Sequence, residues 1–144
     1  MPLVLGFDGS PGATCALQAA LDLCLKLGDR LLIAYAYEPP ARRIGEELAE
    51  HRAALREFGE QVAREGVAQA KAKGVEAETV LVEARPAEGL RDLAARHHAR
   101  MIVVGTQGES PRKRAILGST PHKLLQLSEH PVLVIPPDGG RENP

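Results

Sequence analysis

Five short apolar runs, each of strand length, recur along the chain with helical patterns between them. Glycine, proline or charged residues bound the runs, which cover Leu3–Asp8, Leu31–Ala36, Thr79–Val82, Met101–Val104 and Val132–Ile135. Strands that alternate with helices are typical of a parallel sheet, because each crossover must return the chain to the same end of the sheet. The pattern therefore predicts an α/β fold with right-handed crossovers and helices on both faces.

The segments between the runs carry apolar stripes at helical spacing. The stripes comprise Leu17, Ala20, Leu21 and Cys24, then Ile44, Leu48, Leu55, Phe58 and Val62, then Leu90, Ala94 and His97. Each stripe predicts a helix face that packs on the sheet.

The strand order follows from which runs are apolar throughout. The first, second and fourth runs are almost continuously apolar, as strands covered on both faces should be, whereas the third has polar neighbours and suits an edge. The order 3-2-1-4-5 satisfies this pattern. In it, the helices after strands 1 and 4 diverge to opposite faces, so a crevice opens at the C-terminal ends of these strands. We predict one domain over residues 1–137, with a flexible tail at 138–144.

Composition argues against several classes of partner. The 18 basic and 19 acidic residues leave a net charge of -1, so no overall field attracts nucleic acid or an acidic membrane. The apolar runs fall far short of the ~20 residues of a membrane helix, and we expect a cytoplasmic protein. The two cysteines, Cys15 and Cys24, lie on opposite faces of one predicted helix. We expect both to be reduced, and we assign no metal site.

A loop with spaced glycines follows the fourth strand. It reads Gly105-x2-Gly108-x9-Gly118 and is followed directly by Ser119. Glycine lets the backbone approach an oxyanion closely and adopt positive φ, so that successive N–H groups converge on one phosphate. Because the loop borders the predicted crevice, it predicts a phosphate site.

A helix is predicted to start at the end of this loop. Ser119 and Thr120 are residue types that cap helix N-termini, and Pro121 suits a first turn, although it supplies no amide donor. The free amides, the helix dipole and the two hydroxyls would together attract anionic oxygens. Arg112 lies in a basic triplet of the same loop, which either neutralises phosphates or forms a solvated turn.

Asp8 comes at the end of the first strand, on the other side of the crevice. Its carboxylate can accept hydrogen bonds from a ribose or base, help hold a divalent cation, or cap the helix that begins near Pro11. Two familiar phosphate loops are absent, because Gly118 is not followed by lysine and residues 6–12 do not read G-x-G-x-x-G. We therefore predict neither P-loop hydrolysis nor dinucleotide redox chemistry.

With these motifs the sequence resembles the universal stress protein family over essentially its whole length. The matching segments are VLGFDGSP (4–11), RPAE (85–88), RMIVVG (100–105), the glycine motif and HPVLVIP (130–136). In that family the glycine motif marks the ATP-binding branch. The resemblance implies a Rossmann-like fold of the adenine nucleotide alpha hydrolase type and ATP or another adenine nucleotide as ligand, with or without Mg²⁺.

The resemblance also implies roles for individual residues. The phosphates and ribose would be held by Gly105, Gly108, Gly118, Ser119 and Thr120, while the nucleoside would meet Asp8 with its neighbour Pro11, and Ala36 by position alone. We expect a stress-response sensor or switch that acts through its dimer or through a protein partner.

Three alternatives stand beside this hypothesis. A slow ATPase or nucleotide transferase would have Asp8 and the basic triplet but no evident base aimed at water, so we assign no catalytic residue and expect at most weak turnover. A structural dimer would ignore nucleotide. A receiver-type phosphorylation switch is set aside, because Glu83 and Pro136 stand where that chemistry needs aspartate and lysine.

The last strand, Val132–Ile135, is strongly apolar although the strand order puts it at an edge. An exposed apolar edge invites pairing with another chain. We predict a two-fold homodimer through this strand, as the resemblance also implies.

Overall fold

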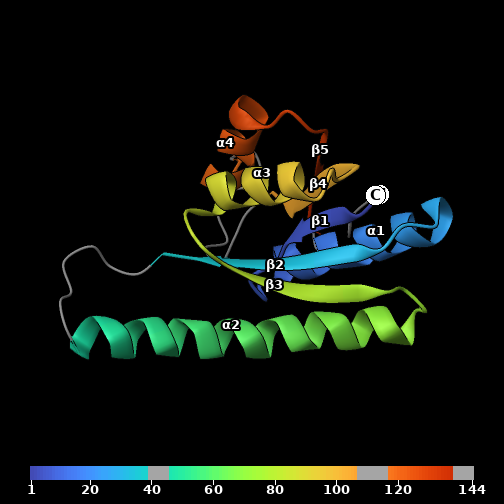
Figure 1. The fold of residues 1–144 in the computed structure, drawn as a ribbon. Helices are drawn as coiled ribbons and strands as arrows, with labels where there is room; N and C mark the ends of the chain where they lie inside the picture. The colour runs from blue at the N-terminus through green and yellow to red at the C-terminus, as the bar shows by residue number, and fades with distance from the viewer. Residues whose placement is uncertain (39–45, 107–116, 138–144) are drawn as a thin grey trace.

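The computed structural model describes residues 1–38, 46–106 and 117–137. It confirms a five-stranded parallel sheet of order β3-β2-β1-β4-β5 with helices on both faces (Figure 1). The elements in chain order are β1 (Leu3–Gly6), α1 (Pro11–Leu27), β2 (Leu31–Tyr37), α2 (Glu46–Ala72), β3 (Ala77–Glu83), α3 (Pro86–Arg96), β4 (Met101–Gly105), α4 (Ser119–Leu127) and β5 (Val132–Ile135). The predicted tail, 138–144, lies outside the described residues.

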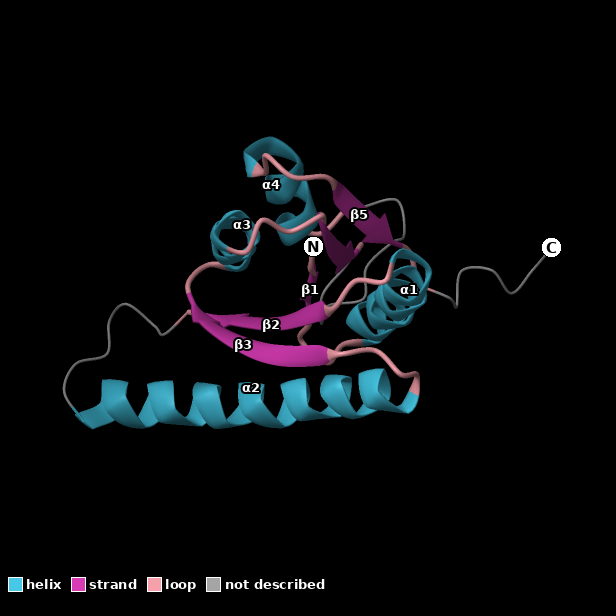
Figure 2. Ribbon diagram, turned by 45° about the vertical axis from the view of Figure 1, so that its right-hand side comes forward, coloured by secondary structure: helices cyan, strands magenta, loops and turns pink. Residues whose placement is uncertain are grey.

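Two apolar layers enclose the sheet, with α1 and α2 on one face and α3 and α4 on the other (Figure 2). Leu3 and Leu5 of β1 pack into the layer with α1, whereas Val4 between them packs into the layer with α3. Successive side chains of a strand point to opposite faces. The continuous apolar run of β1 is therefore explained by burial on both faces, and all members of the predicted α1 stripe are buried as well.

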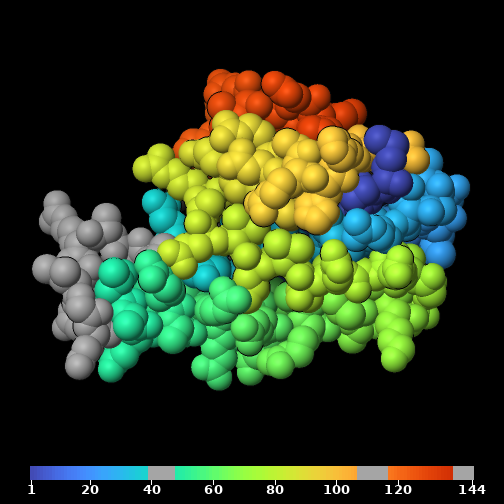
Figure 3. All heavy atoms as spheres, viewed as in Figure 1, coloured from blue at the N-terminus to red at the C-terminus, as the bar shows by residue number. Residues whose placement is uncertain are grey.

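The predicted α2 stripe is wrong at Phe58, whose side chain is 48% exposed. The buried face contains Gly59 instead, because a Cβ at that position would lie 2.5 Å from the ring of Tyr35. Phe58 meets the same ring edge-on, with ring centroids 6.0 Å apart. Helix α2 thus packs a glycine, and not a larger side chain, against Tyr35 of β2. The helix runs along one side of the molecule (Figure 3). Ile44 of the stripe lies outside the described residues.

Some strand boundaries also differ from the prediction. β1 ends at Gly6, before Asp8, because Gly9 turns the chain with a φ of +80°. β3 begins at Ala77, earlier than the apolar run, because its pairing with β2 already starts at Leu31. Backbone pairing continues through polar residues, which an apolar pattern does not show.

The cysteines differ in their surroundings. Cys24 is buried, and this burial, with a smaller effect from the nearby charge of Asp29, raises its pKa to about 11. Cys15 is half-buried, and neither cysteine forms a disulfide. Within the described residues, no helix is long and apolar enough to cross a membrane.

A buried carboxylate ties together the N-terminal ends of the strands. The side chain of Asp29 is 4% exposed and accepts hydrogen bonds from the Arg100 guanidinium and, at 3.4 Å, from the N-terminal amine. The Arg100 amide in turn donates to the carbonyl of Pro2 at 2.8 Å. The hydrogen bond from Arg100 lowers the pKa of Asp29 below its usual value.

Replacing Arg100 with methionine should therefore cost stability in a pH-dependent way. The lowered pKa means that Asp29 stabilises the fold above the unfolded-state pKa of about 3.9, and that this contribution is lost as the pH falls through the folded-state pKa. In thermal melts, the Tm difference between wild type and Arg100→Met should be large near neutral pH and shrink below about pH 4. Arg96→Met, at an exposed site on α3, is the control. A Tm difference that does not change with pH would contradict this assignment.

Candidate functional site

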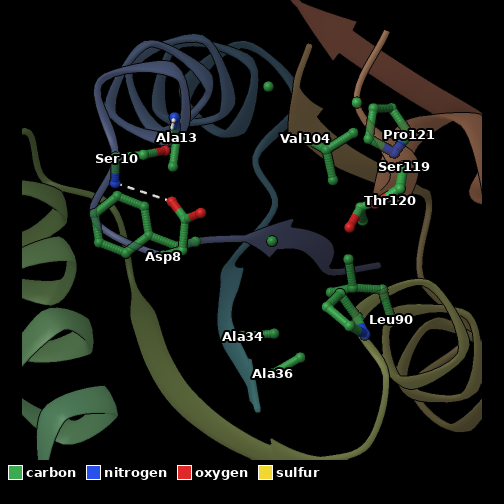
Figure 4. A pocket seen from close by; sticks show the side chains of 15 residues that line it. Asp8, Ser10, Ala13, Ala34, Ala36, Leu90, Val104, Ser119, Thr120 and Pro121 are labelled. Carbon is green, nitrogen blue, oxygen red and sulfur yellow. Dashed lines mark hydrogen bonds between the residues drawn. The ribbon is translucent and has the colours of Figure 1, made fainter. Parts of the chain in front are cut away.

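A cleft opens at the C-terminal ends of β1 and β4, where the chain leaves toward opposite faces (Figure 4). The cleft has a volume of about 180 Å³ and is open to solvent at its mouth. Its lining comes from both strands, β2, and the first turns of α1, α3 and α4. The lining residues are Gly6, Phe7, Asp8, Ser10, Ala13, Ala34, Ala36, Pro86, Leu90, Val104, Gly105, Gly118, Ser119, Thr120 and Pro121.

Most of the residues predicted for a site meet in this cleft. Those that line it are Asp8, Ala36, Gly105, Gly118, Ser119 and Thr120. Pro11 begins α1 next to the cleft but is not among the lining residues. Gly108 and Arg112 lie outside the described residues.

The β1–α1 turn fixes the position of Asp8. Ser10 is the N-cap of α1, since its Oγ accepts a hydrogen bond from the Ala13 amide at 3.2 Å. Asp8 does not cap the helix; its Oδ1 accepts from the Ser10 amide at 2.9 Å. The second carboxylate oxygen of Asp8 bonds to no described residue and points into the cleft (Figure 4). Asp8 is also the only charged side chain among the described lining residues.

The start of α4 differs from the prediction by one residue. Gly118 is the N-cap, with φ -64° and ψ 166°, so Ser119 and Thr120 are the first helical residues rather than caps. The reason is the hydrogen bond from the Gly118 amide to the carbonyl of Thr106 at 2.7 Å, which holds Gly118 in an extended conformation beside β4.

The first turn of α4 keeps donors free. The His122 amide donates to the Gly118 carbonyl at 3.2 Å, and Pro121 has no amide hydrogen. The backbone amides of Ser119 and Thr120 donate to no described residue, and no side chain caps the helix. These two amides, with the hydroxyls of the same residues, form the polar end of the cleft.

The glycines of the cleft are needed for reasons other than those predicted. Of the described glycines, those with positive φ are Gly9, Gly28 and Gly74, so the predicted positive φ is wrong for Gly105 and Gly118. At Gly105 the constraint is space, because a Cβ there would lie 2.8 Å from the carbonyl oxygen of Gly12. Gly105 thus allows the end of β4 to touch the first turn of α1.

The apolar end of the cleft combines the predicted Ala36 with three residues that sequence reasoning missed, Ala34, Pro86 and Leu90. Ala34 and Ala36 of β2 form its floor, and Pro86 and Leu90 of α3 form a wall. Helix α3 can approach because position 6 is glycine, where a Cβ would lie 2.9 Å from Leu90. In the sequence, Leu90 is indistinguishable from any other core residue of an amphipathic helix. Pro86, within the RPAE segment, was the only available signal.

The strand register also determines where the backbone N–H and C=O of Ala36 point. The Phe7 amide donates to the Ala34 carbonyl at 2.9 Å on the β1 side, and the Ala84 amide donates to the Tyr37 carbonyl at 3.0 Å on the β3 side. Because backbone groups alternate between the two sides of a strand, the N–H and C=O of Ala36 point to the β1 side, where β1 has already ended. Neither group bonds to another described residue. A donor and an acceptor therefore face the cleft side by side.

Comparison with known proteins agrees with this architecture. The model of the universal stress protein family matches residues 1–136. A universal stress protein of Thermus aquaticus is 34% identical over 135 residues, which cover 92% of this chain and 96% of that protein. A solved family member from Burkholderia pseudomallei is 31% identical, with a TM-score of 0.79 over 94% of this chain and 95% of that one. A universal stress protein solved in complex with cAMP is 28% identical, with a TM-score of 0.73 over 94% and 96% of the two chains. The chain belongs to the universal stress protein family.

Proposed function

We propose that this protein is an adenine-nucleotide-binding module, with ATP as its ligand, that acts as a cytoplasmic stress-response sensor or switch through its dimer or a protein partner. The observation that carries the proposal is the unpaired N–H and C=O of Ala36, which face a cleft whose other end offers the free amides of Ser119 and Thr120. A nucleotide carries a base at one end and phosphates at the other, and these can bond to the two ends of the cleft.

The base end suits adenine. Adenine presents an acceptor, N1, next to a donor, the 6-amino group. The Ala36 N–H can donate to N1 while its C=O accepts from the amino group. Guanine presents the reverse order, with O6 as acceptor and N1–H as donor, so like groups would face each other. A site that leaves polar groups unpaired rejects the wrong ligand strongly.

The other parts of the cleft suit a ribose and phosphates. The free Asp8 oxygen can accept hydrogen bonds from ribose hydroxyls. At the far end, the Ser119 and Thr120 amides and the positive end of the α4 dipole can hold phosphate oxygens. Gly108 is included in the proposed site on the family motif, Pro11 as a neighbour of Asp8, and Arg112 because its charge can neutralise phosphates. The relative solved with cAMP, an adenine nucleotide, supports this assignment.

Mg²⁺ would be held mainly by the phosphates and water. Among the described residues, no group of three or more His, Cys, Asp or Glu side chains is placed to hold a metal ion. Asp8 can supply one carboxylate oxygen, and Mg²⁺ commonly uses one or two carboxylates together with substrate phosphates. We therefore propose that Mg²⁺ binds together with ATP.

A thermal-shift panel tests the proposal, together with mass analysis of any small molecule that co-purifies. ATP, ADP, AMP and GTP would each be added with and without Mg²⁺. Binding to the folded state alone adds about 2.7 kcal/mol at a ligand concentration of about 100 Kd, so ATP should raise Tm clearly. Equal shifts with GTP would contradict the role of Ala36, and no shift with any adenine nucleotide would refute the proposed function.

The proposed dimer can be tested at β5. The Ile102 amide donates to the Pro131 carbonyl and the Thr106 amide to the Ile135 carbonyl, so odd-numbered residues of β5 face β4. The backbone of Val134 therefore faces outward, at the free edge. Val134→Pro removes an edge donor without breaking the ladder to β4, and proline is tolerated at such positions. We expect light scattering to give a dimer for the wild type and a folded monomer for this variant.

The control for this test is Leu133→Pro, whose missing amide belongs to the ladder with β4. It should lower Tm by breaking this ladder, whereas Val134→Pro should lose only the stabilisation that dimer formation gives. A wild-type mass equal to one chain at every concentration would count against the dimer.

A further inference from the structure

An ion pair next to the base end of the cleft is not used by the nucleotide site as described so far. Glu38 comes two residues after Ala36, and Arg85 directly precedes Pro86, so each is close in the chain to a lining residue, although neither lines the cleft itself. Their side chains meet, with Arg85 Nε 3.5 Å from Glu38 Oε1. The pair thus joins the end of β2 to the start of α3, beyond Ala36 along the strand.

The backbones that carry the pair are held firmly. The Ala84 amide donates to the Tyr37 carbonyl at 3.0 Å, one residue from each partner. Arg85 is the N-cap of α3, with φ -62° and ψ 139°, and its carbonyl accepts from the Gly89 amide at 2.8 Å. The proline after Arg85 further restricts its backbone. The backbones at the end of β2 and the start of α3 are therefore held together, and the two side chains extend from fixed positions.

The direction of β2 decides on which side of Ala36 the 6-amino group of a bound adenine would lie. Within a residue of a strand, the C=O lies further along the chain than the N–H. The C=O of Ala36, which would accept from the 6-amino group, is thus nearer to Glu38 than the N–H that would donate to N1. A substituent on that amino group would point along β2 toward Glu38 and Arg85.

We propose that the Glu38–Arg85 ion pair determines base specificity by closing the cleft beyond the 6-amino group. It admits purines with an unsubstituted amino group and excludes adenine nucleotides that carry a bulky N6 substituent. This inference rests on the proposed function, since it assumes that the base lies against Ala36.

The variants needed to test the pair should fold. The side chains of Glu38 and Arg85 are 55% and 63% exposed, and ion pairs this exposed contribute little to stability. The same two strands carry a matched control at their opposite ends, the Arg30–Glu78 pair at 3.3 Å, with 39% and 60% exposure. That pair lies at the start of β2 and β3, away from the cleft.

The experiment compares titrations of an adenine nucleotide and its N6-benzyl derivative. The parent would be whichever of ATP, ADP and AMP binds the wild type most tightly. The wild type should bind the N6-benzyl form at least about tenfold more weakly than the parent, and Glu38→Ala and Arg85→Ala should each reduce this ratio to about threefold or less. Glu78→Ala should keep the wild-type ratio, and parent affinity should change little in all variants.

Each outcome decides between the two proposals. Parent binding with no wild-type discrimination, or with discrimination unchanged in both Glu38→Ala and Arg85→Ala, overturns the role of the pair and leaves nucleotide binding intact. A loss of discrimination in Glu78→Ala as well would show a general effect of charge removal and would also overturn it. No binding of any parent nucleotide overturns the proposed function and this inference together.

Discussion

Gly105→Ala should destabilise the fold and abolish nucleotide binding. The added Cβ would lie 2.8 Å from the carbonyl oxygen and 2.9 Å from the carbonyl carbon of Gly12, and these are backbone atoms that cannot rotate away. The end of β4 and the first turn of α1 must therefore move apart, at a cost of about 1–3 kcal/mol for overpacking. Both segments line the cleft, so its shape would change with them.

Urea denaturation and ATP titration of the same variant would check both parts. Gly118→Ala is the matched control, because φ -64° and ψ 166° are accessible to alanine. It should unfold at nearly the wild-type urea concentration. If Gly105→Ala is as stable as the wild type, the close approach of β4 to α1 is not the reason why position 105 is glycine.

Ala36→Leu should abolish adenine-nucleotide binding without loss of stability. The side chain of Ala36 lies on the floor of the apolar end, so a leucine there would occupy the space proposed for the base (Figure 4). We expect affinity to fall by at least about 100-fold, which corresponds to about 2.7 kcal/mol. The unliganded Tm should change little, because the new side chain extends into the cleft rather than into the packed core.

Small substitutions at the same position provide the control. If the backbone N–H and C=O recognise the base, then Ala36→Gly and Ala36→Ser should keep affinity within a few-fold of the wild type in the same titration. Binding by Ala36→Leu at wild-type strength would place the base elsewhere. A large loss in Ala36→Gly would show that the methyl group, and not the backbone, makes the essential contact.

The sheet and the place of the cleft could be predicted because they depend on patterns that the sequence displays directly. Leu3, Val4 and Leu5 are apolar without alternation, and both faces of β1 are covered. The polar neighbours of the third run likewise marked an edge strand. Once the order was fixed, the crevice followed from topology alone.

The sequence could not show why particular positions require glycine, since this depends on distances between segments far apart in the chain. Gly105 is explained by Gly12, and Gly59 by Tyr35, and neither partner is visible in a local pattern. The position of Gly118 as the N-cap of α4 depends on a hydrogen bond to Thr106.

The unpaired backbone groups of Ala36 were the feature hardest to predict from the sequence. An alanine at the end of an apolar run shows no chemistry of its own. Ala36 acquires a function only because β1 stops at Gly6 while β2 continues to Tyr37, which leaves its backbone groups unpaired. The sequence resemblance pointed to this position, but the register supplies the physical reason.

A crystal structure of the protein grown with ATP tests the central claim most directly. We predict density in the cleft, with adenine N1 and the 6-amino group at hydrogen-bonding distance from the N–H and C=O of Ala36, and with a phosphate at the amides of Ser119 and Thr120. A cleft without ATP at saturating concentration, or a base that makes no contact with the Ala36 backbone, would contradict the account.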